Sequence, residues 1–152
     1  MSIFHSLNAS SSALTAQRLR MDVISSNMAN VDTTRAKLVD GEWQPYRRKT
    51  VTLQPREGQF SSFLQVAKGN HTHGSANGVT VTRVKEDRET PFKLVFDPTH
   101  PDANEEGYVQ MPNVDPLREM IDLMSATRSY EANVTVLNAN KSMLMKALEI
   151  GK

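Results

Sequence analysis

The sequence predicts an α+β protein in which long helices at the two ends flank a small central antiparallel β domain. Three observations lead to this class. No proline or glycine occurs from Ile3 to Val31, and no glycine occurs between Pro116 and Gly151. Both ends repeat apolar residues every seven positions. The centre holds six of the chain's seven glycines, and glycine interrupts helices, so helical ends are set apart from a turn-rich middle.

The N-terminal helix is predicted from Ile3 to about Val31. Its apolar residues repeat at seven-residue spacing, at Leu7, Leu14, Met21 and Met28, with Ile24 at a helical offset. Such a repeat is the seam of a coiled coil, because 3.5 residues per supercoiled turn keep one stripe against a partner. The packed face of an ordinary helical hairpin is the competing interpretation of this stripe.

The C-terminal helix has clear start and stop signals. Asp115 before Pro116 is typical of an N-cap followed by proline at the first helical position, and Gly151 fits a C-terminal cap. One seven-residue row comprises Leu123, Tyr130, Leu137 and Leu144. A second row comprises Met120, Thr127, Val134, Lys141 and Leu148. Together they form an apolar stripe along a helix about 50 Å long, too long to hide in a small core.

The centre of the chain is predicted to be β-structured. Four short alternating runs are its expected strands: Val51–Leu53, Val79–Val84, Phe92–Phe96 and Tyr108–Met111. Residues 69–78 are expected to form a mobile surface loop. The predicted domains are a discontinuous helical domain, 1–36 and 113–152, and a central β-rich domain, 37–112.

Composition excludes several classes of protein. Only 38% of the 152 residues are hydrophobic, which is a small share for a large core buried within a single chain. A net charge of +1 argues against electrostatic nucleic-acid binding, and no apolar run approaches the length of a membrane span. The absence of cysteine rules out a thiolate metal site, and the first eight residues show no ordinary secretory signal.

No enzymatic constellation stands out. The sequence has no Gly-rich phosphate loop and no nucleophile elbow. His71 and His73, with His100 elsewhere, are interpreted as solvated histidines rather than a metal site. The basic run from Arg47 to Lys49 is interpreted as a strand end or a polar interface contact rather than a ligand site. The three glycosylation-like triplets are interpreted as chance: they begin at Asn8, Asn70 and Asn133.

Two segments give the chain a recognisable resemblance. Residues 25–34, SSNMANVDTT, resemble the N-terminal signature of the flagellar axial proteins, which are rod, hook and hook-associated subunits. Residues 128–133, RSYEAN, resemble the matching C-terminal signature. Within that family, residues 45–49, 107–116 and 147–152 are similar to proximal-rod subunits.

The resemblance implies a structural role with no catalytic residue, cofactor or metal. It implies that the terminal helices pair antiparallel as a coiled coil and pack with those of neighbours into a helical assembly. The expected interface residues are Leu7, Leu14, Met21, Ile24, Met28, Met120, Leu123, Tyr130, Val134, Leu137, Leu144 and Leu148. The family-signature residues are Asn27, Asn30, Thr33, Arg128, Tyr130, Glu131 and Asn133. Five of them are expected to fix register through side-chain hydrogen bonds or ion pairs, with a structural role at the edge of the core as the competing interpretation: Asn27, Asn30, Arg128, Glu131 and Asn133.

The resemblance also implies partners and a location. These are other copies of the chain, the rod proteins FlgB, FlgF and FlgG, the basal-body adaptor FliE and the flagellar type III export apparatus. The expected location is the basal body, outside the cytoplasmic membrane after export, without membrane integration or nucleic-acid binding. A coiled-coil adaptor with a ligand-binding β domain is the alternative, and a small hydrolase or metal protein is a third.

Overall fold

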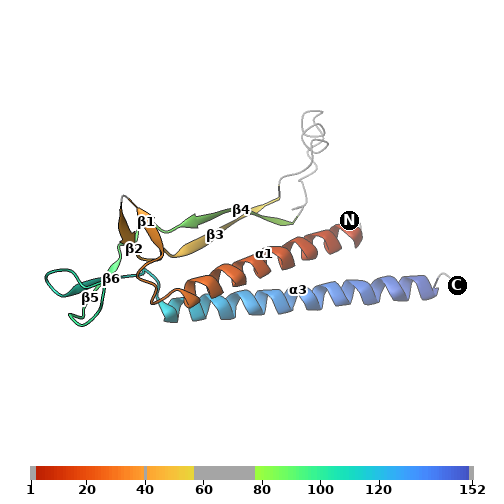
Figure 1. The fold of residues 1–152 in the computed structure, drawn as a ribbon. Coiled ribbons are helices and arrows are strands. Elements are labelled where there is room, and N and C mark those ends of the chain that lie inside the picture. The colour runs from red at the N-terminus through yellow and green to blue at the C-terminus, as the bar shows by residue number, and fades with distance from the viewer. Residues whose placement is uncertain (1–2, 40, 57–77, 151–152) are drawn as a thin grey trace, which may run out of the picture. The chain divides into compact units, whose positions relative to one another are not determined.

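The computed structural model describes residues 3–39, 41–56 and 78–150, and it confirms the α+β class (Figure 1). Helix α1, Ile3–Ala29, opens the chain and helix α3, Pro116–Ile150, ends it. Between them lie six strands: β1 (Lys37–Val39), β2 (Glu42–Gln44), β3 (Lys49–Pro55), β4 (Val79–Glu86), β5 (Lys93–Phe96) and β6 (Tyr108–Met111). The loop predicted at 69–78 lies outside the described residues except for Gly78.

The predicted N-cap of the second helix is confirmed. The Leu117 backbone N–H donates to Asp115 Oδ1 at 3.1 Å, and the Glu119 N–H donates to the Asp115 carbonyl at 3.0 Å. Pro116 occupies the first helical position, where its missing N–H costs no hydrogen bond. The sequence and the structure therefore agree on where α3 begins.

The first helix ends two residues before the predicted boundary. The N–H groups of Asn30 and Val31 bond three residues back, to Asn27 and Met28, in a tightening turn. The Asn30 side chain donates to the Ser26 carbonyl at 2.8 Å and so satisfies one of the helix's last acceptors. This side-chain cap ends α1 without a glycine.

The predicted β domain consists of three separate two-stranded sheets. In β5–β6, Phe96 pairs with Tyr108 and Lys93 with Met111, and the Phe96 and Tyr108 rings meet edge to face at 5.3 Å. Bonds from Asp87 N to Arg48 O and from Arg56 N to Gly78 O, each 2.8 Å, lie at the two ends of β3–β4. All four predicted strands are confirmed.

The hairpin β1–β2 was not predicted. It is antiparallel, with Leu38 opposite Trp43 and Val39 opposite Glu42, which leaves a two-residue connection. Gly41 in that connection has φ +89°, a conformation that favours glycine. An Asp-Gly pair between two strands is a strong signal for a hairpin turn. The sequence of residues 40–41 therefore indicates this hairpin, although the short strands on either side do not.

The chain divides into two compact units. The first unit comprises residues 1–20, 52–83 and 126–152, and the second comprises 21–51 and 84–125. Buried side chains of the first unit include Ser10, Ala16, Ala126 and Asn140. Those of the second include Val23, Ile24, Asn27, Tyr46, Val109, Asn113, Val114 and Glu119. Both cores mix small or apolar side chains with polar ones.

Candidate functional site

A buried polar cluster lies in the second unit around Asn27, whose side chain is only 1% exposed. Asn27 Nδ2 donates to the Lys49 carbonyl at 2.8 Å and to Glu119 Oε2 at 3.0 Å. Asn27 Oδ1 accepts from the Lys49 N–H at 2.9 Å and from the Tyr46 hydroxyl at 3.1 Å. All four hydrogen-bonding positions of this amide are used, as a buried polar group requires.

Arg48 completes the cluster by pairing with a buried carboxylate. Its Nε donates to Glu119 Oε1 at 2.5 Å, and its Nη2 donates to Asp122 Oδ2 at 3.3 Å. Glu119 is fully buried, at 0% exposure, so it depends on these partners for its charge to be tolerated. The Arg48 backbone N–H donates to Asn113 Oδ1 at 2.8 Å, which ties the same residue to the segment before α3.

The cluster joins three parts of the chain that are distant in sequence. Asn27 comes from the last turns of α1, Arg48 from the segment between β2 and β3, and Glu119 from the first turn of α3. Asn113 Nδ2 adds bonds to the Asp87 and Thr90 carbonyls at 3.0 and 3.1 Å. A closed network of this kind positions backbone elements, and its carboxylate has no exposed surface for a substrate.

The other predicted signature residues make local contacts. Thr33 Oγ1 donates to Asn30 Oδ1 at 3.2 Å, and Asn133 Nδ2 donates to the Ser129 carbonyl at 2.8 Å. Arg128 and Glu131 are exposed, and Tyr130 is half-buried. The N-terminal signature lies in the second unit and Arg128–Asn133 in the first. Their role in fixing register between subunits stays a prediction.

The predicted heptad rows differ in burial. Half-buried members are Leu7, Leu14, Met21, Met28, Leu123, Tyr130, Val134, Leu137 and Leu144, and Ile24 is buried. Met120 and Leu148 are exposed. On α3 the buried residues are instead Glu119, Ala126 and Asn140, which lie on the seven-residue row one position before the Met120 row; Asn133, the member between Ala126 and Asn140, is half-buried. Met120 and Leu148 therefore remain accessible to other chains.

A second polar contact joins the segment after α1 to the β5–β6 loop. Thr34 Oγ1 donates to Asp102 Oδ2 at 2.7 Å, and Arg35 Nε donates to Asp102 Oδ1 at 2.6 Å. The Arg35 hydrogen bond, followed by that of Thr34, holds the pKa of Asp102 below its ordinary value of 3.8. Asp102 is therefore ionised at neutral pH and engaged by its own chain.

Metal and membrane sites find no support in the described part of the chain. No three histidine or acidic residues gather there as a possible metal site. His71 and His73 lie outside the described residues, as does Asn70, whereas His100 Nδ1 accepts the Asp102 N–H at 3.1 Å. Across the described ranges, neither helix combines the length and apolar character that crossing a bilayer requires.

Family comparisons match both ends of the chain. Residues 7–37 match the family described as flagella basal body rod protein, and residues 105–150 match the family described as flagellar basal body rod FlgEFG protein C-terminal. The matched segments include most of α1 and all of α3. Together they define a class, the flagellar basal-body rod proteins.

Full-length relatives narrow this class. Flagellar basal-body rod protein FlgC of Bacillus subtilis (strain 168) is 65% identical over 152 residues, which is 100% of both chains. FlgC of Borreliella burgdorferi is 44% identical over 161 residues, covering 99% of this chain and 98% of that one. FlgC of Escherichia coli O157:H7 is 43% identical over 100% of both chains. The chain belongs to the FlgC family of flagellar basal-body rod proteins.

Proposed function

We propose that the chain is a structural subunit of the proximal rod of the bacterial flagellar basal body, and that it acts by assembly rather than catalysis. Family membership supports this role because the relatives are named as rod proteins. The observation that carries the proposal is the amount of apolar side chain left exposed on α3. A surface of this kind on a chain this small requires other chains to cover it.

The start of α3 presents one exposed apolar face in the second unit. Leu117, Met120, Ile121 and Met124 have the i, i+3, i+4, i+7 spacing of a single helix face. Their exposures are 69%, 52%, 56% and 56%. Burying the exposed apolar area of these four side chains against another subunit contributes on the order of 5 kcal/mol to association. Methionine suits contacts with several different neighbours because its thioether side chain is flexible.

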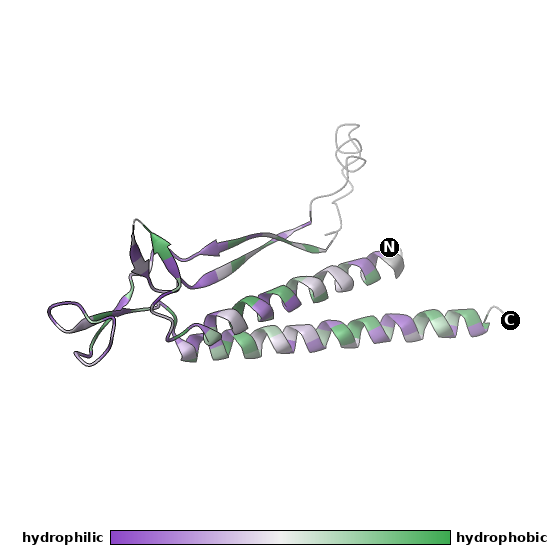
Figure 2. Cartoon of the chain, in the orientation of Figure 1, coloured by the Kyte–Doolittle hydropathy of each residue, from purple (hydrophilic) through white to green (hydrophobic). Residues whose placement is uncertain are grey.

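The C-terminal part of α3, residues 136–150 in the first unit, is apolar on more than one side. Val136, Met143 and Ile150 repeat every seven positions and are all exposed. Met145 and Leu148 are exposed at other angles around the same helix. Figure 2 shows hydrophobic residues along this end of α3. A helix that is apolar around much of its circumference is covered from several directions in its working state.

The assembly model uses the terminal helices as an antiparallel coiled coil. The 3.0 Å bond from Asn27 to Glu119 supports it, because it joins the end of α1 to the beginning of α3. In this proposal the predicted interface residues of both helices face each other or neighbouring subunits. Residues 1–36 and 113–152 act as the helical assembly domain, and residues 37–112 act as the β-rich domain.

The proposed partners follow from the same role. They are further copies of the chain, the rod proteins FlgB, FlgF and FlgG, and the adaptor FliE. The proposed route to the basal body is the flagellar type III export apparatus, which moves unfolded chains. A chain without cysteine suits that route, since no disulfide has to be reduced before export.

The test adds charge to the exposed face at the start of α3. Met120→Asp with Met124→Asp is expected to abolish rod incorporation and motility in cells lacking their own copy of the gene. Both side chains are exposed, so unfolding of the purified chain in urea is expected to shift by less than about 1 kcal/mol. Incorporation is measured as the amount of the chain in purified basal bodies.

A control places the same charges on β3 instead of on a helix. Thr52→Asp with Gln54→Asp puts two aspartates at exposed polar positions of that strand. This control is expected to assemble like the unaltered chain. Normal incorporation of the Met120/Met124 variant would contradict the proposal. An equal loss in the control would attribute the defect to added charge rather than to the apolar face.

A further inference from the structure

The charges of the second unit are segregated along the sequence. Residues 35–49 contain five arginines and lysines against two acidic residues. Residues 94–117 contain five acidic residues, and no lysine or arginine falls among them. A near-neutral chain with +1 net charge therefore carries one basic and one acidic segment within a single compact unit.

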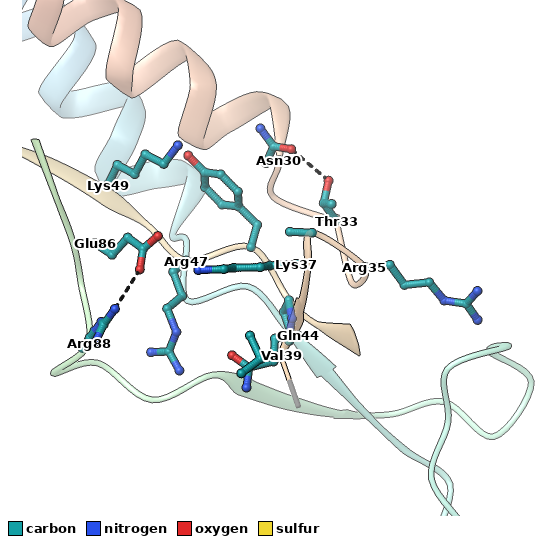
Figure 3. A pocket seen from close by; sticks show the side chains of 13 residues that line it. Asn30, Thr33, Arg35, Lys37, Val39, Gln44, Arg47, Lys49, Glu86 and Arg88 are labelled. Carbon is teal, nitrogen blue, oxygen red and sulfur yellow. Dashed lines mark hydrogen bonds and ion pairs between the residues drawn. The ribbon is translucent and has the colours of Figure 1, made fainter. Parts of the chain in front are cut away.

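The basic segment lines an open cleft of about 800 Å³, shown in Figure 3. Lys37, Arg47 and Lys49 contribute cations to its lining. The guanidinium of Arg47 lies 4.3 Å from the centre of the Phe92 ring, and Lys49 Nζ lies 5.6 Å from that of Tyr46. In the part of the chain that the structure describes, none of these three cations forms an ion pair with a carboxylate.

The remaining charges around the cleft are already compensated. Arg88 pairs with Glu86 at 3.5 Å, and among the described residues that line the cleft Glu86 is the one acidic residue. Arg35 also lines it, but its guanidinium binds Asp102 and points away from the other cations in Figure 3. Three cations that form no ion pair among the described residues thus line one cleft, which favours an anionic occupant.

The acidic segment includes the turn between β5 and β6, which is held in place by hydrogen bonds. Asn104 Oδ1 accepts the Glu106 N–H at 3.1 Å and the Tyr108 N–H at 2.7 Å, and the Gly107 N–H donates to the Asn104 carbonyl at 2.9 Å. Gly107 has φ +82°, which favours glycine at this turn. Glu105 and Glu106 are exposed on it. Presentation on a fixed turn lowers the entropic cost of binding.

We propose that the basic cleft of one subunit receives the Glu105–Glu106 turn of a second copy of this chain. The inference rests on the proposed function and deepens it by naming a contact between copies. Each copy carries both a cation-lined cleft and an exposed anionic turn, so the two surfaces are complementary. Asp102, a third carboxylate of the loop between β5 and β6, is already engaged by Arg35 of its own chain.

This pairing has a consequence for the geometry of assembly. A contact between two different patches is heterologous, and repeating it generates a ring or an open helical series rather than a closed dimer. Two clefts, or two acidic turns, placed face to face would repel each other. Exposed ion pairs contribute only about 0.2–1 kcal/mol each, so the contact mainly selects the orientation of neighbouring copies.

The test is a charge swap in cells lacking their own copy of the gene. Lys37→Glu with Lys49→Glu is expected to reduce the chain recovered in purified basal bodies by about tenfold. Glu105→Lys with Glu106→Lys is expected to cause a similar loss. The chain carrying all four changes presents complementary surfaces of reversed sign, so its recovery is expected to return to within about twofold of the unaltered chain.

Controls separate this contact from folding and from the proposed function. Arg83→Glu with Lys85→Glu reverses two exposed charges on β4 outside the cleft and is expected to assemble normally. Each variant's helix content is checked by circular dichroism. The inference is overturned if the fourfold variant is no better than either pair, or if the Glu105/Glu106 change alone has no effect, which would assign the cleft to another acidic partner. Failure of the rod function itself would appear in the Met120/Met124 test.

Discussion

Glu119→Ala is expected to destabilise the second unit by about 3–5 kcal/mol, which is the cost of breaking a buried ion pair. The substitution removes the carboxylate that accepts from both Arg48 Nε and Asn27 Nδ2. It leaves the half-buried guanidinium with its weaker 3.3 Å bond to Asp122. It also leaves the Asn27 amide with one partner fewer in a site that water does not reach.

Urea unfolding followed by circular dichroism measures this loss. Asp122→Ala is the matched control, because it removes a more exposed carboxylate from the same arginine and is expected to cost less than about 1 kcal/mol. Glu119→Gln keeps the shape and one acceptor, so its cost is expected to fall between the two. A Glu119→Ala variant as stable as Asp122→Ala would show that the buried cluster does not hold the unit together.

Gly78→Ala is expected to destabilise the first unit by about 2–3 kcal/mol. Gly78 has φ +96°, and a Cβ there would clash with Ser12 Oγ and lie 3.3 Å from the Ala9 Cα. Ser12 Oγ accepts the Val79 N–H at 3.0 Å and donates to the Ala9 carbonyl at 2.7 Å. The added methyl group forces this hydroxyl to move and so disturbs the bond between α1 and the start of β4.

Gly41→Ala provides a clean comparison for that prediction. Gly41 has a similar φ of +89°, but a Cβ there would meet no atom of the described residues within 4 Å. Its substitution is expected to incur backbone strain alone, about 1 kcal/mol. The difference between the two urea midpoints measures the Ser12 contact. Equal midpoints would mean that Ser12 adapts without loss and that the contact is dispensable.

The helices could be predicted because their signals are local. A seven-residue repeat, the Asp115–Pro116 cap and the absence of glycine are all visible in short windows, and α3 begins at the predicted residue. Four strands were found by alternation for the same reason. The hairpin at 37–44 was missed because its strands are three residues long, too short to show a period, although Asp-Gly marked its turn.

The buried cluster could be predicted only in part because its partners are far apart. The sequence predicts a polar role for Asn27, but the residue bonds to Glu119, 92 positions away. The residues next to Asn27 in the sequence do not indicate Glu119 as its partner, and those next to Glu119 do not indicate Asn27. The basic run at 47–49 appeared as one surface feature. In the fold, Arg48 enters the buried ion pair while Arg47 and Lys49 line the cleft. The local sequence pattern does not encode where each side chain lies in the tertiary structure. Neighbouring residues of this basic run therefore have two different roles.

We propose that neighbouring subunits cover the exposed apolar face of α3, and cysteine labelling measures this coverage. The natural chain has no cysteine, so Met124→Cys introduces a single thiol at an exposed position. We expect rapid reaction with a maleimide in the free chain, at least tenfold slower reaction in purified basal bodies, and recovery of the rapid rate once those basal bodies are dissociated. Equal rates in the free chain and in intact basal bodies would contradict it.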